Sequence, residues 1–376
     1  MRRSVLAAVV TILTAAAGLT ACEPAPTCGA VITADTTLAA DIRECAGDGL
    51  VIGADGVTLD LGGHTIASGT DDTGGRGTVG IRIEGHDDVT ILGGTVTGFA
   101  TGVGATDAAR LALDRLTVSA GVTGVRFDRV RDGHLGRSSV AGAFDSILLL
   151  RSARNSVHDT VGVGDADTRS AIRLERSNGN IVTDGTFRGS NGPNIQLVGS
   201  HRNRVEGNDA GGSNTAGIEL VGSHRNRVLR NLTASESESV TLVDSDDTLV
   251  DGNDGGRSTI VVSGSDRTRV TRNLAGAIRI ASSTGTIVTY NTVTHAWADV
   301  ITVDAASADT RLVGNVVTVS GQDGIDVEHV GTYVADNVSD RNGERGIEAV
   351  AGVTDGGGNR ARDNGETPEC LNVVCT

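Results

Sequence analysis

Lysine is missing from this sequence altogether, so arginine supplies every positive side chain apart from histidine. The formal net charge is −15, and such an acidic surface argues against nucleic acid and against direct adsorption to anionic lipid. Aromatic residues make up only 2% of the chain. Binding clefts for neutral sugars often stack a ring on the pyranose, so this scarcity does not favour such a cleft. Binding of an acidic polymer through arginine or calcium remains an alternative.

Repetition is what the sequence has in abundance. The nonapeptide LVGSHRNRV occurs at Leu197–Val205 and again at Leu220–Val228, 23 residues later. Aligning the apolar residue that opens each unit extends this register over 266 residues in twelve steps, a mean of about 22 per repeat. The residue two places after each opener is usually apolar too, which indicates a short strand with one buried face. The openers are Ile81, Val103, Val125, Ile147, Ile172, Ile195, Ile218, Val240, Ile260, Ile278, Ile301, Ile325 and Ile347.

A second register follows about ten residues after each opener and repeats Asn or Thr, then Val or Leu, then Asn. Asn side chains stacked one coil apart can hydrogen-bond in a ladder, and Asn also tolerates left-handed turns. A weaker third strand follows the closing Asn. Three strands and three turns in about 22 residues predict one coil of a parallel β-helix, and thirteen or fourteen coils predict a rod roughly 60 Å long. The closing residues are Asn208, Asn231, Asn253, Asn273, Asn291, Asn315 and Asn337, and the leading ones are Asn155, Asn180, Asn203, Asn226, Thr248, Thr268, Thr286, Thr310 and Thr332.

The stretch ITADTTLAADIREC, followed by GLVIGADGVTLDLGGHTI over Gly49–Ile66, resembles the N-terminal entry of secreted right-handed parallel β-helix proteins of the pectin lyase-like superfamily. The end, GNRARDNGETPECLNVVC, is similar to the closing cap of the same bacterial group, so the resemblance covers about residues 28–376. It implies one all-β domain, a right-handed parallel β-helix, with residues 28–48 and 365–376 as its caps. It does not select an activity, because this fold hosts lyases, hydrolases, epimerases, adhesins and scaffolds.

Residues 1–21 are expected to be a signal peptide. Arg2 and Arg3 precede an apolar run over Val5–Ala17, which is too short to span a membrane. The following LTAC resembles the lipobox of bacterial lipoproteins, which implies cleavage before Cys22 and lipidation of that residue, with residues 22–27 as a tether. We expect an exported monomer, anchored through its lipid to the outer face of the cell membrane. An ordinary secretory signal with an incidental cysteine is the alternative.

Five cysteines are an odd number for an exported chain, and lipidation of Cys22 leaves four. These four form two close pairs, Cys28 with Cys45 and Cys370 with Cys375, one at each end of the solenoid. Terminal coils have no neighbour to cover their core, so a disulfide formed in an oxidising compartment is a suitable closure for each cap. Zinc is the alternative for four cysteines, but the pairs lie at opposite ends of the predicted rod.

Two histidines, His201 and His224, occupy matching positions one coil apart, in the turn between the first and second strands. A zinc or copper site needs a third ligand there, whereas the adjacent coils supply Asn178 and Asp246. A straight column with about 4.8 Å per coil does not easily bring three such groups to one ion, so a solvated turn is the favoured interpretation. The repeats also resemble those of NosD-type proteins, which are linked to copper-enzyme maturation, but one Met and no His cluster make a poor copper site.

One outward row of the first strands becomes acidic near the end of the chain. We predict that Asp304, Asp326, Glu328 and Glu348 share one external face over three coils. Carboxyl groups about 5 Å apart suit a retaining glycosidase pair, and a cluster of oxygen ligands suits calcium. An ordinary solvated acidic patch is the alternative. The sequence therefore predicts a β-helix binding or structural module for extracellular polysaccharide, with a calcium-assisted polysaccharide lyase or glycoside hydrolase as the other hypothesis.

Overall fold

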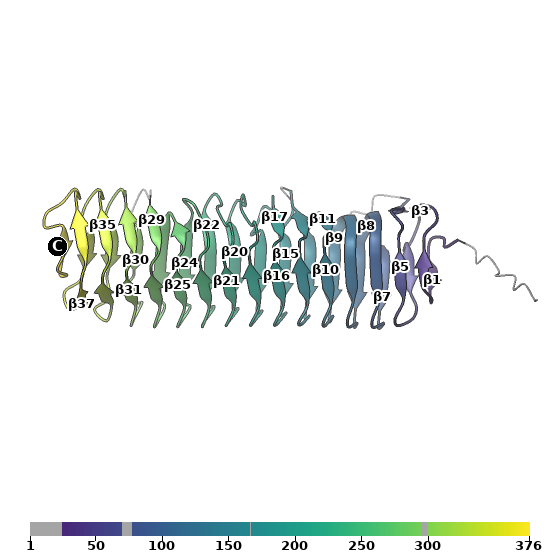
Figure 1. Ribbon diagram of the computed structural model, residues 1–376, viewed down its shortest axis with the longest axis horizontal. Coiled ribbons are helices and arrows are strands. Elements are labelled where there is room, and N and C mark those ends of the chain that lie inside the picture. The colour runs from purple at the N-terminus through teal and green to yellow at the C-terminus, as the bar shows by residue number, and fades with distance from the viewer. Residues whose placement is uncertain (1–24, 70–76, 166, 295–298) are drawn as a thin grey trace, which may run out of the picture.

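The computed structural model describes residues 25–69, 77–165, 167–294 and 299–376, and all regular elements in these ranges are β-strands. Successive coils stack into a long rod of about 15 turns, with the C-terminal end of the chain at one tip (Figure 1). The parallel β-helix that the repeat predicted is confirmed. Within the described ranges, no helix is long and apolar enough to cross a membrane.

The first strands of the coils form one parallel sheet along the rod. Ile195 pairs with Ile218, and the other openers pair in the same way, so the alignment made from the sequence is confirmed. The caps add a strand at each end, around Ala30 and around Cys370, which is why the rod has more turns than the repeat count predicted. The strands of this sheet are β1 (Ala30–Ile32), β4 (Leu50–Ile52), β7 (Val79–Glu84), the ends of β8 (Thr90–Thr106) and β9 (Ala112–Asp128), β12 (Asp145–Leu150), β15 (Ser170–Glu175), β18 (Ile195–Val198), β20 (Ala216–Val221), β22 (Glu238–Val243), β24 (Thr259–Ser263), β27 (Ala277–Ala281), β30 (Ile301–Val303), β33 (Ile325–Val327), β36 (Ile347–Ala349) and β39 (Cys370–Leu371).

The second and third strands form two further faces, and β8 and β9 run through all three without a break. The second face contains β2 (Thr36–Thr37), β5 (Thr58–Asp60), β10 (His134–Gly136), β13 (Ser156–His158), β16 (Ile181–Thr183), β19 (Arg204–Glu206), β21 (Arg227–Leu229), β23 (Leu249–Asp251), β25 (Arg269–Thr271), β28 (Ile287–Thr289), β31 (Arg311–Val313), β34 (Tyr333–Ala335) and β37 (Thr354–Gly357). The third contains β3 (Ile42–Cys45), β6 (Thr65–Ser68), β11 (Ser139–Gly142), β14 (Val161–Val163), β17 (Thr186–Arg188), β26 (Leu274–Ala275), β29 (Thr292–Thr294), β32 (Val316–Thr318), β35 (Val338–Asp340) and β38 (Arg360–Arg362).

The core is a column of stacked aliphatic side chains. From Ile81 to Ile347 every opener is at most 1% exposed, so each coil buries its apolar row against the same row of the next coil. Burial of one such side chain contributes roughly 1.5–3 kcal/mol, and the repeat supplies this contribution in every coil. Phe99, Phe127 and Phe187 are also fully buried. The outward residues of the strands and the turns are consequently free to vary and to carry function.

The closing Asn residues form the predicted ladder inside the rod. From Asn208 to Asn337 each side-chain amide donates to the Oδ1 of the Asn in the next coil over 2.9–3.2 Å, and Asn359 is the last acceptor. A serine row, which the sequence reasoning missed, adds a second buried ladder from Ser152 to Ser307. Each serine hydroxyl in it accepts a hydrogen bond from the backbone N–H of the coil before, over 2.8–3.2 Å.

Both predicted disulfides are present, one in each cap. Cys28 is bonded to Cys45 with a Cα–Cα distance of 5.3 Å, and Cys370 to Cys375 with 6.1 Å. Disulfides persist in oxidising compartments, so these two bonds indicate an exported protein, extracellular or periplasmic. The signal peptide and Cys22 lie outside the described residues.

Candidate functional site

The strand register brings part of the predicted acidic face together. Asp326 on β33 pairs with Glu348 on β36, and Glu328 follows directly after β33. Two carboxylates that the sequence reasoning missed, Asp299 and Asp323, also act electrostatically on Asp326. They belong to the loops that precede the first strands, where strand alternation gives no information about side-chain direction. The acidic face therefore consists of these five residues.

The acidic face holds two carboxyl groups that change protonation near neutral pH. Burial, reinforced by repulsion from neighbouring carboxylates, raises the pKa of Asp323 and of Asp326 to about 6. Asp299 Oδ1 accepts a hydrogen bond from the backbone N–H of Asp323 over 2.9 Å, and Asp323 Oδ1 accepts one from the backbone N–H of Arg345 over 2.7 Å. The Arg345 guanidinium donates to Glu348 over 2.6 Å and so neutralises one edge of the face. Such perturbed acids suit proton transfer or hydrogen bonding to a ligand.

The Asp304 carboxylate is engaged in loop hydrogen bonds. Strand β30 ends at Val303, and the Asp304 side chain caps the loop that follows. Its carboxylate accepts hydrogen bonds from the backbone N–H groups of Ser282 and Ala306, both over 3.2 Å, and from the Ser307 hydroxyl over 2.5 Å. Asp304 occupies the position equivalent to Glu328 one coil earlier, and its place on the acidic face stays a prediction. In the described part of the chain no three His, Cys, Asp or Glu side chains converge closely enough to hold a metal ion, so calcium at the acidic face would require these side chains to move.

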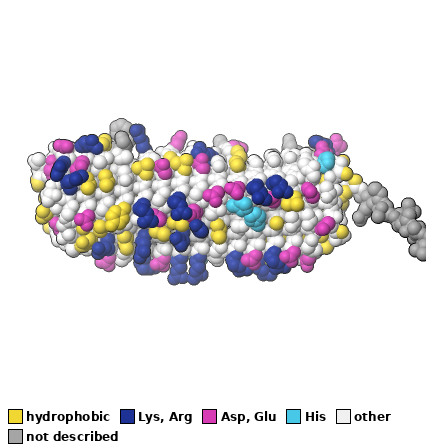
Figure 2. Space-filling model, in the orientation of Figure 1, with side chains coloured by type: hydrophobic (Ala, Val, Ile, Leu, Met, Phe, Trp, Pro, Cys, Tyr) yellow, Lys and Arg dark blue, Asp and Glu magenta, His cyan; other side chains and the backbone are white. Residues whose placement is uncertain are grey.

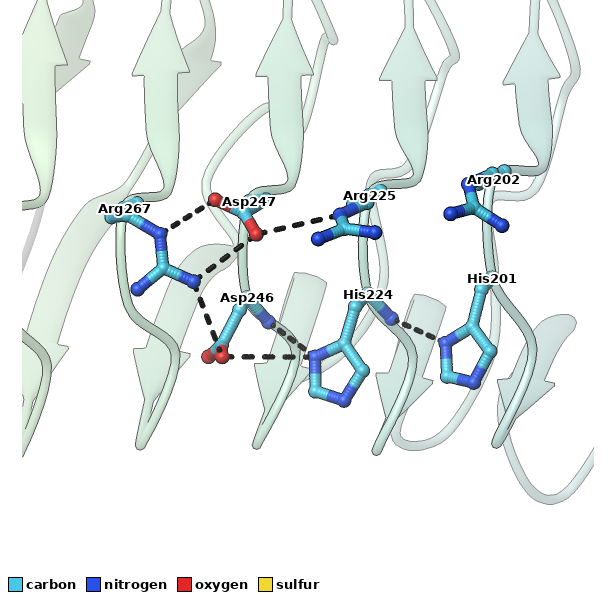
Figure 3. Close-up of a pocket in the computed structure, with 7 residues that line it drawn as sticks. All are labelled: His201, Arg202, His224, Arg225, Asp246, Asp247 and Arg267. Carbon is cyan, nitrogen blue, oxygen red and sulfur yellow. Dashed lines mark hydrogen bonds and ion pairs between the residues drawn. The ribbon is translucent and has the colours of Figure 1, made fainter.

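The turns between first and second strands form a second candidate site, a groove of about 340 Å³ that we call the His–Arg groove (Figure 3). The imidazole rings of His201 and His224, which lie one coil apart as their spacing predicted, stack along it with centroids 5.1 Å apart and planes inclined by 9°. The groove extends over consecutive coils, because its lining residues come from the equivalent turn of each coil. The lining residues are His201, Arg202, His224, Arg225, Asp246, Asp247 and Arg267.

Both histidines of the groove are tied to the backbone of the next coil. The backbone N–H of His224 donates to His201 Nδ1, and that of Asp246 donates to His224 Nδ1, each over 3.0 Å. A neutral ring that accepts at Nδ1 carries its proton on Nε2, and the Nε2 atoms of both rings lie on the ring edge that points away from Arg202 and Arg225 (Figure 3). Burial, together with the positive charge nearby, lowers the pKa of His201 and so favours the neutral ring. A metal ion at Nε2 would need the other tautomer, which would set two N–H groups against each other, so this pair does not fit a metal.

Arginines on the same turns complete the groove. Arg202 makes no ion pair with any described residue, and the Arg225 Nε atom lies 3.7 Å from Asp247. Asp247 is bound more closely by Arg267, through hydrogen bonds of 2.7 and 3.1 Å. Arg202 and Arg225 adopt left-handed backbone angles, φ 56° and 60°, at the turn. The groove thus combines three arginines with two aspartates, a positive balance on a chain whose net charge is −15.

Other coils neutralise the same turn position. The Arg154 guanidinium donates two hydrogen bonds of 2.7 Å to Asp132, and Arg110 binds Asp88 over 2.6 and 2.7 Å. Figure 2 shows the result on the displayed face, where acidic and basic side chains are interspersed rather than segregated. This cross-coil pairing could have been found by reading the turn residues as a column. The groove is distinguished from these pairs by Arg202, which has no ion-pair partner in the described part of the chain.

The profile of the family described as periplasmic copper-binding protein (NosD) matches residues 62–254. No curated protein matches the chain. Among solved structures, the Dettilon tailspike protein (gp208) is 12% identical with a TM-score of 0.45, and the match covers 76% of this chain but only 61% of the tailspike. The DFA-IIIase of Arthrobacter chlorophenolicus A6 without its lid is 15% identical, with a TM-score of 0.41 and coverage of 73% and 70%. The periplasmic alginate epimerase AlgG is 10% identical, with a TM-score of 0.43 and coverage of 89% and 76%.

Proposed function

The chain belongs to the NosD family of periplasmic copper-binding proteins, and from this membership we propose that it is an exported binding module rather than an enzyme. Its principal ligand in this proposal is an acidic polysaccharide, held along the His–Arg groove. The observation that carries the proposal is the guanidinium of Arg202, which has no ion-pair partner among the residues that the structure describes, on the same turns as two imidazole rings whose Nδ1 atoms accept backbone hydrogen bonds.

Carboxylate and sulfate groups are the ligands that such donors recognise. A guanidinium binds a carboxylate through two parallel hydrogen bonds, and the imidazole N–H groups add neutral donors alongside. Each exposed contact contributes at most about 1 kcal/mol, so a single sugar would bind weakly. Coils about 4.8 Å apart repeat the donors along the rod, and a polymer that engages several of them at once gains avidity. The groove therefore suits a polyanion better than a free acidic sugar.

Binding measurements with a glycan panel test this proposal. Calorimetry at low salt should detect binding of uronate or sulfated oligosaccharides, no binding of a neutral glucan, and affinity that rises with chain length. The Arg202→Gln/Arg225→Gln variant should lose at least tenfold in affinity. Arg154→Gln is the matched control, because Arg154 occupies the same turn position but its guanidinium is bound to Asp132. Equal affinity of wild type and double variant would remove the groove as the binding site.

The place of the module outside the cell is part of the proposal. Its two disulfides indicate an oxidising compartment, and the LTAC sequence supports lipidation of Cys22, which would hold the rod on the outer face of the membrane through the tether of residues 22–27. A monomer anchored in this way would meet extracellular or cell-wall polysaccharide.

Cleavage of a polysaccharide is a second candidate function, favoured by one observation. Asp323 and Asp326 both have a pKa raised to about 6, so a larger fraction of each carboxyl group is protonated near neutral pH than for an ordinary aspartate, which suits a general acid. Incubation of the same glycan panel with and without calcium, followed by measurement of new chain ends, separates the two functions. Cleavage that is lost in Asp326→Asn would place an enzyme at the acidic face. Binding without new chain ends would support the binding module.

A further inference from the structure

One outward row on the second strands alternates arginine with aliphatic residues. The strand register pairs Arg227 on β21 with Leu249, and Leu249 with Arg269. It continues from Arg269 to Ile287 and from Ile287 to Arg311. Each of these residues precedes a fully buried valine or leucine, so strand alternation turns its own side chain to the surface. The arginines are exposed and the aliphatic residues half-buried. We call these five residues the arginine row.

The positive charge of the arginine row is not compensated by neighbouring acids. None of its arginines makes an ion pair with any residue in the described ranges. The acids on the same strands already have partners. Glu206 is bound by Arg204 and Arg230, and Asp251 accepts a hydrogen bond from Arg272 over 2.5 Å. On a chain whose net charge is −15, these exposed guanidinium groups are therefore left for an anionic ligand.

The last arginine of the row is held in place by an aromatic ring. Tyr333 occupies the same position in the next coil, and the Arg311 Cζ atom lies 4.2 Å from the centroid of its ring. A guanidinium that stacks on a ring keeps its N–H groups at its edge, where they can still bind a carboxylate through two hydrogen bonds. Because Arg311 is already ordered, it loses less side-chain freedom when a ligand binds.

The spacing of the row sets the repeat of the ligand. Arginines occupy every second coil, so neighbouring charges are about 10 Å apart along the rod. Each sugar of an extended polysaccharide advances by about the height of one coil, so two coils match a disaccharide. Leu249 and Ile287 then face the sugars between the charges. Their apolar surface suits the C–H groups of a neutral sugar, whereas a carboxylate placed there would lose water without gaining a partner.

We propose that the arginine row binds a linear polysaccharide that carries a carboxylate or sulfate group on every second sugar. This inference rests on the proposed function, because it takes the acidic polysaccharide of the His–Arg groove and specifies its repeat. The row borders the groove, since Arg225 and Arg267 of the groove precede Arg227 and Arg269 by two residues. A polymer that runs along the rod can contact arginines of both.

Calorimetry at low salt with two hexasaccharides tests the row. One is cut from hyaluronan, which has a carboxylate on every second sugar, and the other from polygalacturonate, which has one on every sugar. Wild type should bind the hyaluronan hexasaccharide at least fivefold more tightly, and Arg227→Gln/Arg269→Gln/Arg311→Gln should lose at least tenfold of that affinity. Arg204→Gln should keep it and is the matched control, because Arg204 lies in the same column one coil before Arg227 but is bound to Glu206.

A second variant tests the spacing rather than the charge. Leu249→Arg/Ile287→Arg places an arginine on every coil of the row. Its affinity for the polygalacturonate hexasaccharide should rise several-fold more than its affinity for the hyaluronan hexasaccharide, because the added guanidinium groups face the carboxylates that had no partner. An equal rise for both would show that the row recognises charge without regard to spacing and would overturn the proposed repeat.

The other outcomes separate this inference from the proposed function. Unchanged affinity for hyaluronan in the triple variant, together with a loss in Arg202→Gln/Arg225→Gln, would overturn the row and leave the groove as the binding site. Equal binding of both hexasaccharides, or of a single-stranded oligonucleotide, by wild type would overturn the disaccharide repeat. No binding of any acidic oligosaccharide would overturn the proposed function as well. Circular dichroism of each variant checks that the β-helix is intact.

Discussion

Replacing Asn231 by leucine would test whether the buried Asn ladder stabilises the rod or merely fills it. Asn231 is 1% exposed and makes four side-chain hydrogen bonds. Its Oδ1 accepts from the backbone N–H of Asn208 over 2.9 Å and from the side-chain amide of Asn208 over 3.0 Å. Its own amide donates to Val205 O over 3.0 Å and to Asn253 Oδ1 over 2.9 Å. Leucine has a similar volume, so the substitution removes these bonds without opening space for a water molecule.

The expected decrease in the free energy of unfolding follows from the buried groups that lose a hydrogen-bond partner. The backbone N–H and the side-chain amide of Asn208, and the carbonyl of Val205, would be left buried without this hydrogen bond. Asn253 Oδ1 would keep its bond from the backbone N–H of residue 231. Each orphaned buried group costs about 1–3 kcal/mol, so the free energy of unfolding should fall by roughly 3–6 kcal/mol, with some of the loss recovered by relaxation.

Urea unfolding followed by circular dichroism measures the total change, and hydrogen exchange locates it. Because each coil of a solenoid contacts only its neighbours, the loss of protection should be concentrated in the coils around Asn231, and the unfolding transition should broaden as the two halves of the rod uncouple. A decrease below about 1 kcal/mol, or a loss of protection spread evenly along the rod, would refute the assignment of a stabilising role to the ladder.

Three further substitutions test other parts of the molecule. Thr286→Val should leave the free energy of unfolding in urea unchanged or raise it by up to about 1 kcal/mol, because the Thr286 hydroxyl is buried without a hydrogen-bond partner. A clear decrease in the free energy of unfolding would mean that this hydroxyl is hydrogen-bonded. Asp326→Asn should be more stable than wild type by about 1–2 kcal/mol at pH 8 and equal to it below pH 4. The pKa of Asp326 is about 6 in the folded protein and 3.8 ordinarily, so ionisation of this carboxyl group destabilises the native state as pH rises between these values. A stability difference that does not change with pH would contradict an effect of Asp326 ionisation. Cys22→Ser should release the protein from membranes; palmitate label retained in the variant would exclude the lipobox interpretation.

The repeat could be predicted from the sequence because every coil needs the same buried residues in the same places. A misplaced Ile218 or Asn231 would expose an apolar side chain or bury an unpaired amide, so each repeat must keep these residue types at the same positions. Side chains outside the strands obey no such constraint. Asp304 lies one residue past a strand end and turns to cap a loop, and Asp323 reaches the acidic face from a loop. Such positions depend on local hydrogen bonds that periodicity does not encode.

The two histidine pairs show how the position of a residue within its coil sets the distance between side chains on the rod. His201 and His224 occupy equivalent positions of consecutive coils, so their spacing is that of the coils, and their ring centroids lie 5.1 Å apart. Equivalent positions form straight columns whose members cannot close on one small ion but can line a polymer that runs along the rod. His134 and His158 occupy different positions of their coils, since His134 pairs with Ser156 and His158 with Gly136, and this diagonal across a glycine brings their Nε2 atoms to 2.8 Å. An alignment of repeats compares only columns and therefore does not reveal the pair.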